Sequence, residues 1–95
     1  MEEKMKLVSL YEVYKKMLTP HMQEIFEQYY YSDLSLREIA ANKNISYQAV
    51  NDTIKKVGKQ LLEYEENIRA LEMKKDLMLV LENKEIDKIA KKYRW

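Results

Sequence analysis

The side chains that could carry chemistry in this chain are polar and basic rather than nucleophilic or metal-binding. The sequence has no cysteine and one histidine, His21, so it predicts no disulfide, no metal site and no catalytic triad built on Cys or His. The neighbouring carboxylates Glu63, Glu65 and Glu66 are more typical of a solvated helix face than of an acid–base pair. The sequence therefore predicts a protein that is not an enzyme and that uses no cofactor.

The most informative spacing of polar groups lies in the middle of the chain. If this segment is a helix that buries Val50 and Ile54, its outer surface carries Ser46, Tyr47, Gln48, Asn51, Asp52, Lys55, Lys56 and Lys59. The amides of Gln48 and Asn51 can form paired hydrogen bonds with an adenine edge, and lysines can neutralise phosphates. Asp52 is the exception, because phosphates repel a carboxylate unless it accepts from a cytosine amino group.

Two short helices and a tight turn are predicted to position this surface. Ser35 and Glu38 have the spacing of a capping box, and Ser46 is a second N-cap candidate. Between them, Asn44 tolerates the left-handed backbone of a tight turn, and Ala40 is small enough for two helices to cross closely. Branched apolar residues complete the pattern at Ile45, Val50 and Ile54. These constraints predict a helix-turn-helix, whose second helix enters the DNA major groove.

Helical periodicity also runs through the flanking segments. Apolar residues three and four apart predict a helix over residues 5–18. A second helix is expected after Thr19 and Pro20, which suit the N-cap and the first helical position, and a last helix over 76–93, with a boundary near 72–76. With only one Gly and one Pro, we expect an all-α fold of four to five helices, with long C-terminal helices and no wing.

A heptad pattern of apolar residues begins inside the second helix of this unit. Its predicted seam consists of Ile54, Val57, Leu61, Tyr64, Ile68 and Leu71. Such a stripe can pack on the first helices of the same chain or on a second copy, and the small core favours a homodimer. We therefore expect a helical domain over residues 1–60, with the helix-turn-helix at 35–55, and a C-terminal dimerisation extension over 61–95.

The charge is small overall but unevenly distributed. The net charge is +1, which argues against a strong non-specific binder of polyanions. Residues 35–60 contain five basic and two acidic residues, an excess of +3 that falls on the candidate nucleic-acid segment. The longest purely apolar run, Leu77–Leu81, is far shorter than the roughly 18 residues of a membrane span. We therefore expect a cytoplasmic protein with no membrane segment.

The same residues resemble a known family. The stretches M-L-T-P-H-M-Q-E-I-F-E-Q-Y-Y-Y-S-D-L-S-L-R-E-I-A, I-S-Y-Q-A-V-N-D-T-I-K-K and L-L-E-Y-E-E are similar to the YlxM-like helix-turn-helix family over about residues 5–72. The resemblance implies a regulatory protein, similar to region 4 of sigma factors, that has no assigned enzymatic activity and is linked to the signal recognition particle pathway. This chain has Tyr47 where the family usually has an arginine, so one cation is missing.

Two functions are compatible with these observations. The first is a DNA-binding regulatory protein that acts as a homodimer and presents two recognition helices to successive grooves. The alternative is an adaptor that binds a protein, or the protein–RNA particle of the targeting pathway, through the same helical scaffold without DNA. Tyr47, Asp52 and the near-neutral net charge favour the adaptor, whereas the lysines favour DNA.

Overall fold

The computed structural model describes residues 2–83 and residue 92, and the regular structure in them is entirely helical. This confirms the predicted all-α fold. The elements in chain order are α1 (Glu2–Tyr14), the 3-10 turn η1 (Lys15–Met17), α2 (Pro20–Tyr30), α3 (Leu36–Lys43), α4 (Tyr47–Ile68) and α5 (Ala70–Asn83). None of the described helices is both long and apolar enough to cross a membrane.

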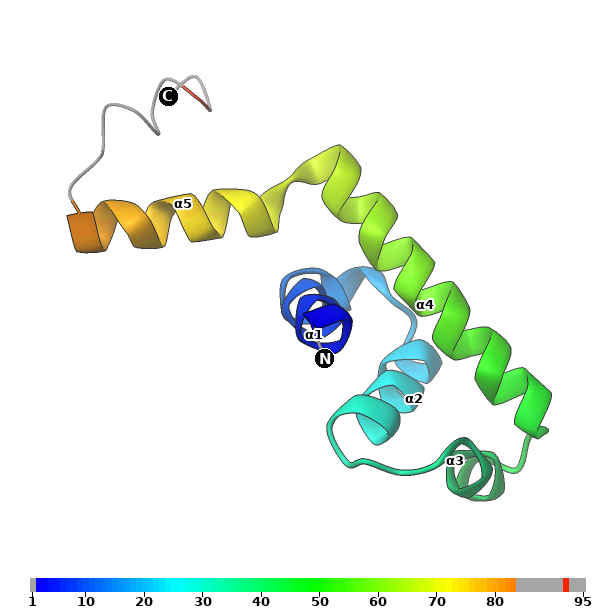
Figure 1. Ribbon diagram of the computed structural model, residues 1–95. Helices are drawn as coiled ribbons and strands as arrows, with labels where there is room; N and C mark the ends of the chain where they lie inside the picture. Colours follow the sequence, from blue (N-terminus) through cyan, green and yellow to red (C-terminus); the bar gives the residue numbers. More distant parts are fainter. Residues whose placement is uncertain (1, 84–91, 93–95) are drawn as a thin grey trace.

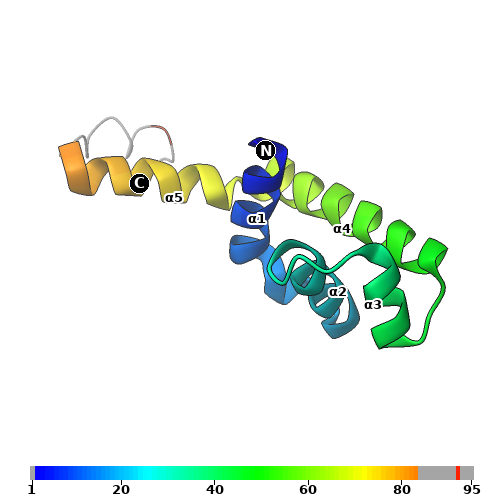
Figure 2. The ribbon, with the colours of Figure 1, turned by 60° about the horizontal axis from the view of Figure 1, so that its bottom comes forward.

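The long helix α4 organises the molecule (Figure 1). Helices α1, α2 and α3 all pack against it, and α3 lies beside its first turns. Helix α5 leaves the far end of α4 and extends away from the other helices, as a second view also shows (Figure 2). The molecule is therefore elongated, measuring 52 × 22 × 19 Å, and the helix-turn-helix and α5 occupy opposite ends.

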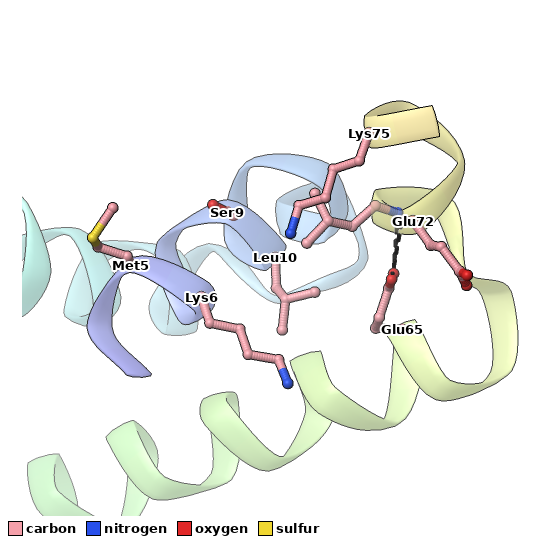
Figure 3. A pocket seen from close by; sticks show the side chains of 8 residues that line it. Met5, Lys6, Ser9, Leu10, Glu65, Glu72 and Lys75 are labelled. Atoms are coloured by element: carbon pink, nitrogen blue, oxygen red, sulfur yellow. Dashed lines mark hydrogen bonds between the residues drawn. The ribbon is translucent and has the colours of Figure 1, made fainter. Parts of the chain in front are cut away.

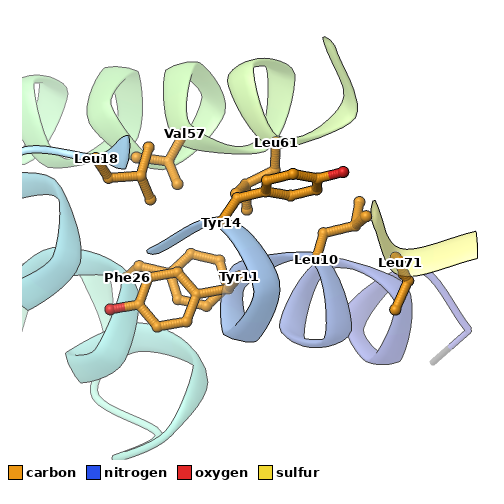
Figure 4. Packing of buried hydrophobic residues seen from close by; sticks show 8 residues of the cluster. All are labelled: Leu10, Tyr11, Tyr14, Leu18, Phe26, Val57, Leu61 and Leu71. Carbon is orange, nitrogen blue, oxygen red and sulfur yellow. The ribbon is translucent and has the colours of Figure 1, made fainter. Parts of the chain in front are cut away.

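The larger of two apolar clusters joins α1 to α2, α4 and α5 (Figure 4). Its centre is an aromatic pair: the rings of Tyr11 and Phe26 stack with centroids 4.2 Å apart. Around this pair lie the other buried members of the cluster, Leu10, Tyr14, Leu18, Val57, Leu61 and Leu71. Helix α1 is thus the central element of the core, and the apolar residues three and four apart that predicted it supply the buried face.

The predicted heptad seam lies mostly inside the chain. Val57 and Leu61 are fully buried and Leu71 almost so, all against α1, while Ile54 and Tyr64 pack against the two clusters. Of the two alternatives for this stripe, packing on the first helices of the same chain accounts for its buried members, because α1 covers Val57, Leu61 and Leu71. The exposed member is Ile68, at 50% of its surface. The expected boundary between two domains at residue 60 falls inside α4. It separates Val57 from Leu61, although both belong to the same apolar cluster.

The junction between the last two helices lies earlier than the predicted boundary at 72–76. Helix α4 ends at Ile68, Arg69 adopts a left-handed conformation with φ 58° and ψ 30°, and α5 begins at Ala70. No glycine, proline or asparagine marks this position, so the bend has no local sequence signal. Helix α5 covers the first part of the predicted helix over 76–93, and residues 84–91 and 93 of that prediction lie outside the described part of the chain.

A non-local hydrogen-bond network holds this bend. The hydroxyl of Tyr14 donates to Glu65 Oε1 at 2.6 Å and accepts from the backbone N–H of Ala70 at 3.0 Å. The two oxygens of Glu65 accept the N–H groups of Leu71 and Glu72 at 3.0 and 3.1 Å. Glu65 thus caps α5 from the last turns of α4. Burial, together with the hydrogen bond to Glu65, raises the pKa of Tyr14.

Candidate nucleic-acid interface

The helix-turn-helix is built by three local devices that the sequence predicted. Ser35 and Glu38 form the reciprocal capping box at the start of α3, with both bonds 3.1 Å long, and hydrogen bonds to Ser35 hold the pKa of Glu38 below its usual value. Asn44 ends α3 in the left-handed region at φ 55° and ψ 45°. Ser46 caps α4 by accepting from the N–H of Ala49 at 3.0 Å. The start of α4 is therefore fixed by local structure.

A second apolar cluster fixes the unit to the rest of the molecule. Ile25 from α2, Ile39 and Ala40 from α3 and Val50 from α4 are buried together. The small side chain of Ala40 lets α3 and α4 approach, and the N–H of Ile45 donates to the carbonyl of Ala40 at 3.0 Å across the turn. The recognition helix is thus carried on a packed scaffold rather than on a loose loop.

The side chains predicted to contact DNA share the outer surface of α4. With Val50 and Val57 buried, helical geometry turns the opposite face to solvent. Exposed residues on this surface are Ser46, Tyr47, Gln48, Asp52, Lys55, Lys56 and Lys59, and Asn51 is half-buried at its margin. The structure therefore brings the predicted set together on the N-cap and the first four turns of α4.

Asp52 is engaged by a neighbour on the same face. The side-chain amide nitrogen of Gln48 donates to Asp52 Oδ1 at 2.8 Å, one helical turn away. This bond leaves the negative charge of Asp52 in place but restrains Gln48, whose Oε1 remains an acceptor. Two acceptors side by side favour a base edge that offers an amino group, such as N4 of cytosine or N6 of adenine.

Arg37, one of the five basic residues of the 35–60 segment, is a functional candidate on α3. Its guanidinium carbon lies 5.9 Å from the ring centroid of Tyr47, a cation–π geometry, and the Tyr47 ring is 49% exposed. Helix α3 thereby places a cation at the head of α4, where the sequence has a tyrosine instead of arginine. Sequence spacing could not reveal this pair, because the two residues meet only through the crossing of α3 and α4.

The basic residues of the unit differ in availability. Lys43 forms an ion pair with Glu24, which also lowers the pKa of Glu24, so Lys43 is already occupied. Within the described residues, Lys55, Lys56 and Lys59 have no ion-pair partner and are exposed. These three lysines are therefore the cations of α4 that remain available to an anionic partner.

The tyrosine run before α3 is used for packing. Tyr30 lies against Phe26 with ring centroids 4.5 Å apart, and Tyr29 meets Tyr30 edge-on at 4.9 Å. The hydroxyl of Tyr31 donates to Glu12 on α1, and burial raises the pKa of Tyr31. Across the described residues, no three His, Cys, Asp or Glu side chains converge as metal ligands.

Helix α4 has an exposed, partly basic outer face and packs on α1, α2 and α3, and the tight turn at Asn44 joins it to α3. This arrangement defines a helix-turn-helix protein. The comparison with known families agrees. The family described as "Putative helix-turn-helix protein, YlxM / p13 like" (UPF0122) matches residues 1–94, and this chain belongs to it. The resemblance found in the sequence is thus confirmed, and it extends beyond the 5–72 segment.

Curated relatives support the same assignment. A UPF0122 protein of Mycoplasma mycoides is 42% identical over 84 residues, which cover 88% of this chain and 74% of the relative. Those of Ureaplasma parvum and Fusobacterium nucleatum are 39% and 36% identical, covering 86% and 81% of this chain and 86% and 75% of the relatives. No solved structure matches the chain.

Proposed function

We propose that this chain is a cytoplasmic DNA-binding regulatory protein that places the first turns of α4 in the major groove. The observation that carries the proposal is one exposed face of α4. Gln48 and Asn51 lie near its N-terminus, and Lys55, Lys56 and Lys59 follow them along the helix. The lysines contact phosphates and set the register, while Gln48 and Asn51 reach base edges. Nothing in this role requires a catalytic group or cofactor.

Arg37 completes the proposed interface from α3. The exposed ring of Tyr47 restrains the guanidinium at the head of α4, so that its donors can reach a phosphate or the O6 and N7 atoms of guanine. Tyr47 therefore positions a cation instead of supplying one. On this account the basic contribution of α3 comes from Arg37, since Lys43 is paired with Glu24.

Variants separate the two kinds of contact. We expect Lys55→Ala and Lys56→Ala to weaken binding to all duplexes alike, because phosphates carry no sequence information. Gln48→Ala or Asn51→Ala should cost about 1–3 kcal/mol, and only at particular base pairs. Fluorescence anisotropy on a duplex library selected with the wild-type chain measures both effects.

A matched control tests whether position matters more than charge. Lys16 is exposed and has no ion-pair partner among the described residues, but it lies in η1, outside the interface. Lys16→Ala should leave the affinity within twofold. Equal losses from Lys16→Ala and Lys55→Ala would contradict a defined contact surface and indicate non-specific attraction.

We further propose that two copies pair through α5, instead of through the heptad seam of α4. The run Leu77–Leu81 is apolar all round, with Leu77, Met78 and Leu79 exposed and Leu81 exposed at 84%. A helix that is apolar on every side is normally buried, and a second α5 presents the same apolar surface. The bend at Arg69 would then set the separation of the two recognition helices.

Sedimentation equilibrium tests this pairing. A dimer mass is expected at tens of micromolar protein, and Leu81→Lys should shift the chain to monomer while leaving its helicity intact, because Leu81 contributes little to the core of one copy. A wild-type monomer mass at that concentration would remove the proposal. As a control, Leu62→Lys changes an exposed leucine on α4, 46% exposed, and should leave the dimer in place.

The second candidate function is an adaptor of the protein-targeting machinery, such as a partner of signal recognition particle components. The exposed ring of Tyr47 and the carboxylate of Asp52 on the recognition face favour it. It predicts little duplex binding even in low salt, and a partner that is lost when Tyr47 is changed. Pull-down of the tagged chain with and without nuclease distinguishes a protein partner from one held through nucleic acid.

A further inference from the structure

A groove lies inside the bend between α4 and α5, at the opposite end of the molecule from the helix-turn-helix. Its volume is about 670 Å³, within the range of small-molecule sites. One wall is the outer half of α1, and the other is the first turns of α5, with the end of α4 beneath (Figure 3). The groove therefore exists only while the bend is kept.

The groove has an apolar floor. Leu10 from α1 and Leu71 from α5 lie at its base, Leu71 with 8% of its surface exposed and Leu10 with none. Met5 stands at its rim, 70% exposed, and an unbranched thioether side chain adapts its shape to an apolar ligand. A short hydrocarbon chain would therefore find apolar contacts with Leu71 and Met5.

The two carboxylates that border the groove are already engaged. Glu65 accepts from the hydroxyl of Tyr14 and from two backbone N–H groups of α5. Glu72 is paired with Arg69 at 2.6 Å and Lys92 at 2.7 Å, and hydrogen bonds from these two cations lower the pKa of Glu72 to about 2. Neither carboxylate needs a cation from a ligand.

The two lysines that border the groove are not engaged in this way. Lys6 on α1 and Lys75 on α5 are exposed, and neither has an ion-pair partner within the described residues. Figure 3 shows both ammonium groups extending over the space between the helices. The groove thus combines an apolar floor with two lysines at its mouth that form no ion pair within the described residues, and Glu65 contributes one negative charge to its lining.

We propose that this groove binds a small amphiphilic anion, in which one carboxylate or phosphate group is carried on a short apolar chain. The chain lies over Leu71 and against Met5, and the anionic group is held between Lys6 and Lys75. Because α1 and α5 both contact the ligand, binding favours the bent arrangement and steadies α5. The site shares no residue with the recognition face of α4, so it stands independently of DNA binding.

Titration of the full chain with simple probes tests both halves of the ligand. Octanoate and octyl phosphate, each kept below its micelle concentration, are expected to shift the NMR amide signals of Leu71, Lys75 and Ser9 saturably. Octanol lacks the charge, and inorganic phosphate lacks the chain, so each should bind at least tenfold more weakly. Equal binding of octanol and octanoate would overturn the proposal, as would the absence of any saturable shift.

Charge variants locate the anionic group. Lys6→Gln combined with Lys75→Gln should weaken octanoate about tenfold, as expected for the loss of two exposed charge contacts, while far-ultraviolet circular dichroism stays unchanged. Lys16→Gln removes a lysine outside the groove and should leave the affinity as it was. Equal affinity in the wild type and the double variant would show that these lysines do not hold the ligand and would overturn the site.

Discussion

The two turns that flank α4 have nearly the same backbone conformation but different causes. Asn44 before α4 has φ 55° and Arg69 after it has φ 58°, both left-handed and neither a glycine. The first turn is built from residues close in sequence, since Ser46 caps the helix that follows. The second depends on Tyr14, whose hydroxyl accepts a hydrogen bond from the backbone N–H of Ala70. These two residues are 56 positions apart in the sequence.

This difference separates a turn that is specified locally from one that is imposed by packing. Asparagine adopts the left-handed region more readily than other residues with a β-carbon, whereas arginine has no such preference. Residues around Arg69 would otherwise continue α4 into α5, because they are good helix formers. The stability of the bend therefore depends on the contacts that α1 and Glu65 make with the start of α5.

The largest expected effect comes from removing the packing under the second turn. Leu61→Lys places a charge where no side-chain surface is exposed, at a cost of several kcal/mol, so we expect most of the chain to unfold. Thermal melting followed by circular dichroism measures it. If Leu61 instead formed an intermolecular seam, the variant would remain a folded monomer, which would contradict the burial described here.

Leu62 offers the matched comparison for this variant. It is the next residue in α4 and is 46% exposed. Leu62→Lys should change the free energy of unfolding by less than about 0.5 kcal/mol, as is usual for surface substitutions.

A smaller loss is expected from breaking the network itself. Glu65→Ala removes the acceptor of three hydrogen bonds and should lower the free energy of unfolding by about 2–3 kcal/mol, at about 1 kcal/mol for each bond. Urea denaturation measures the loss. Glu66→Ala, on the exposed side of the same helix, is the control and should have little effect; equal losses would show that the network does not stabilise the bend.

Damage to the first turn, at Asn44, should lower the free energy of unfolding by less. Ser46→Ala removes the N-cap of α4 and should cost about 1 kcal/mol, again measured in urea. Ser32→Ala is suitable as a control, because Ser32 is exposed and precedes no helix directly. A loss from Ser46→Ala larger than that from Glu65→Ala would reverse the comparison between the two turns.

The smallest effects come from placing glycine at each turn. Arg69→Gly should stabilise the bent chain by about 0.5–1 kcal/mol, because glycine adopts positive φ without the penalty that arginine has. Asn44→Gly should change stability by only a few tenths of a kcal/mol. Paired urea titrations compare the two, and destabilisation by Arg69→Gly would indicate that the α4–α5 bend is not the conformation in solution.

The contrast also explains what could be predicted from the sequence. The capping box at Ser35, the start of α2 after Thr19 and the turn at Asn44 each follow from neighbouring residues, and all three are present. The bend at Arg69 and the covering of Leu61 by α1 could not be predicted, because both depend on contacts between distant segments. A heptad pattern indicates an apolar stripe but does not identify the helix that covers it.

In the candidate interface too, features set by local spacing could be predicted, and contacts between helices could not. Helical spacing placed Gln48, Lys55 and Lys59 on one face, and the structure agrees. It could not reveal that Lys43 is paired with Glu24, or that Arg37 lies over Tyr47, because each pair joins two different helices. Of the five basic residues in 35–60, Lys43 is therefore the one that its ion pair with Glu24 removes from the available cations.

Titration of duplex DNA at about 50 mM salt tests the central claim most directly. If the outer face of α4 binds DNA, mixed-sequence duplex should bind at roughly 10⁻⁴–10⁻⁶ M, and a genomic site more tightly. With about three phosphate contacts in each copy, a dimer should give a slope of log K against log salt of about −5, and a monomer about −3. The absence of binding in this range would contradict the DNA proposal and leave the helix-turn-helix as a scaffold for another partner.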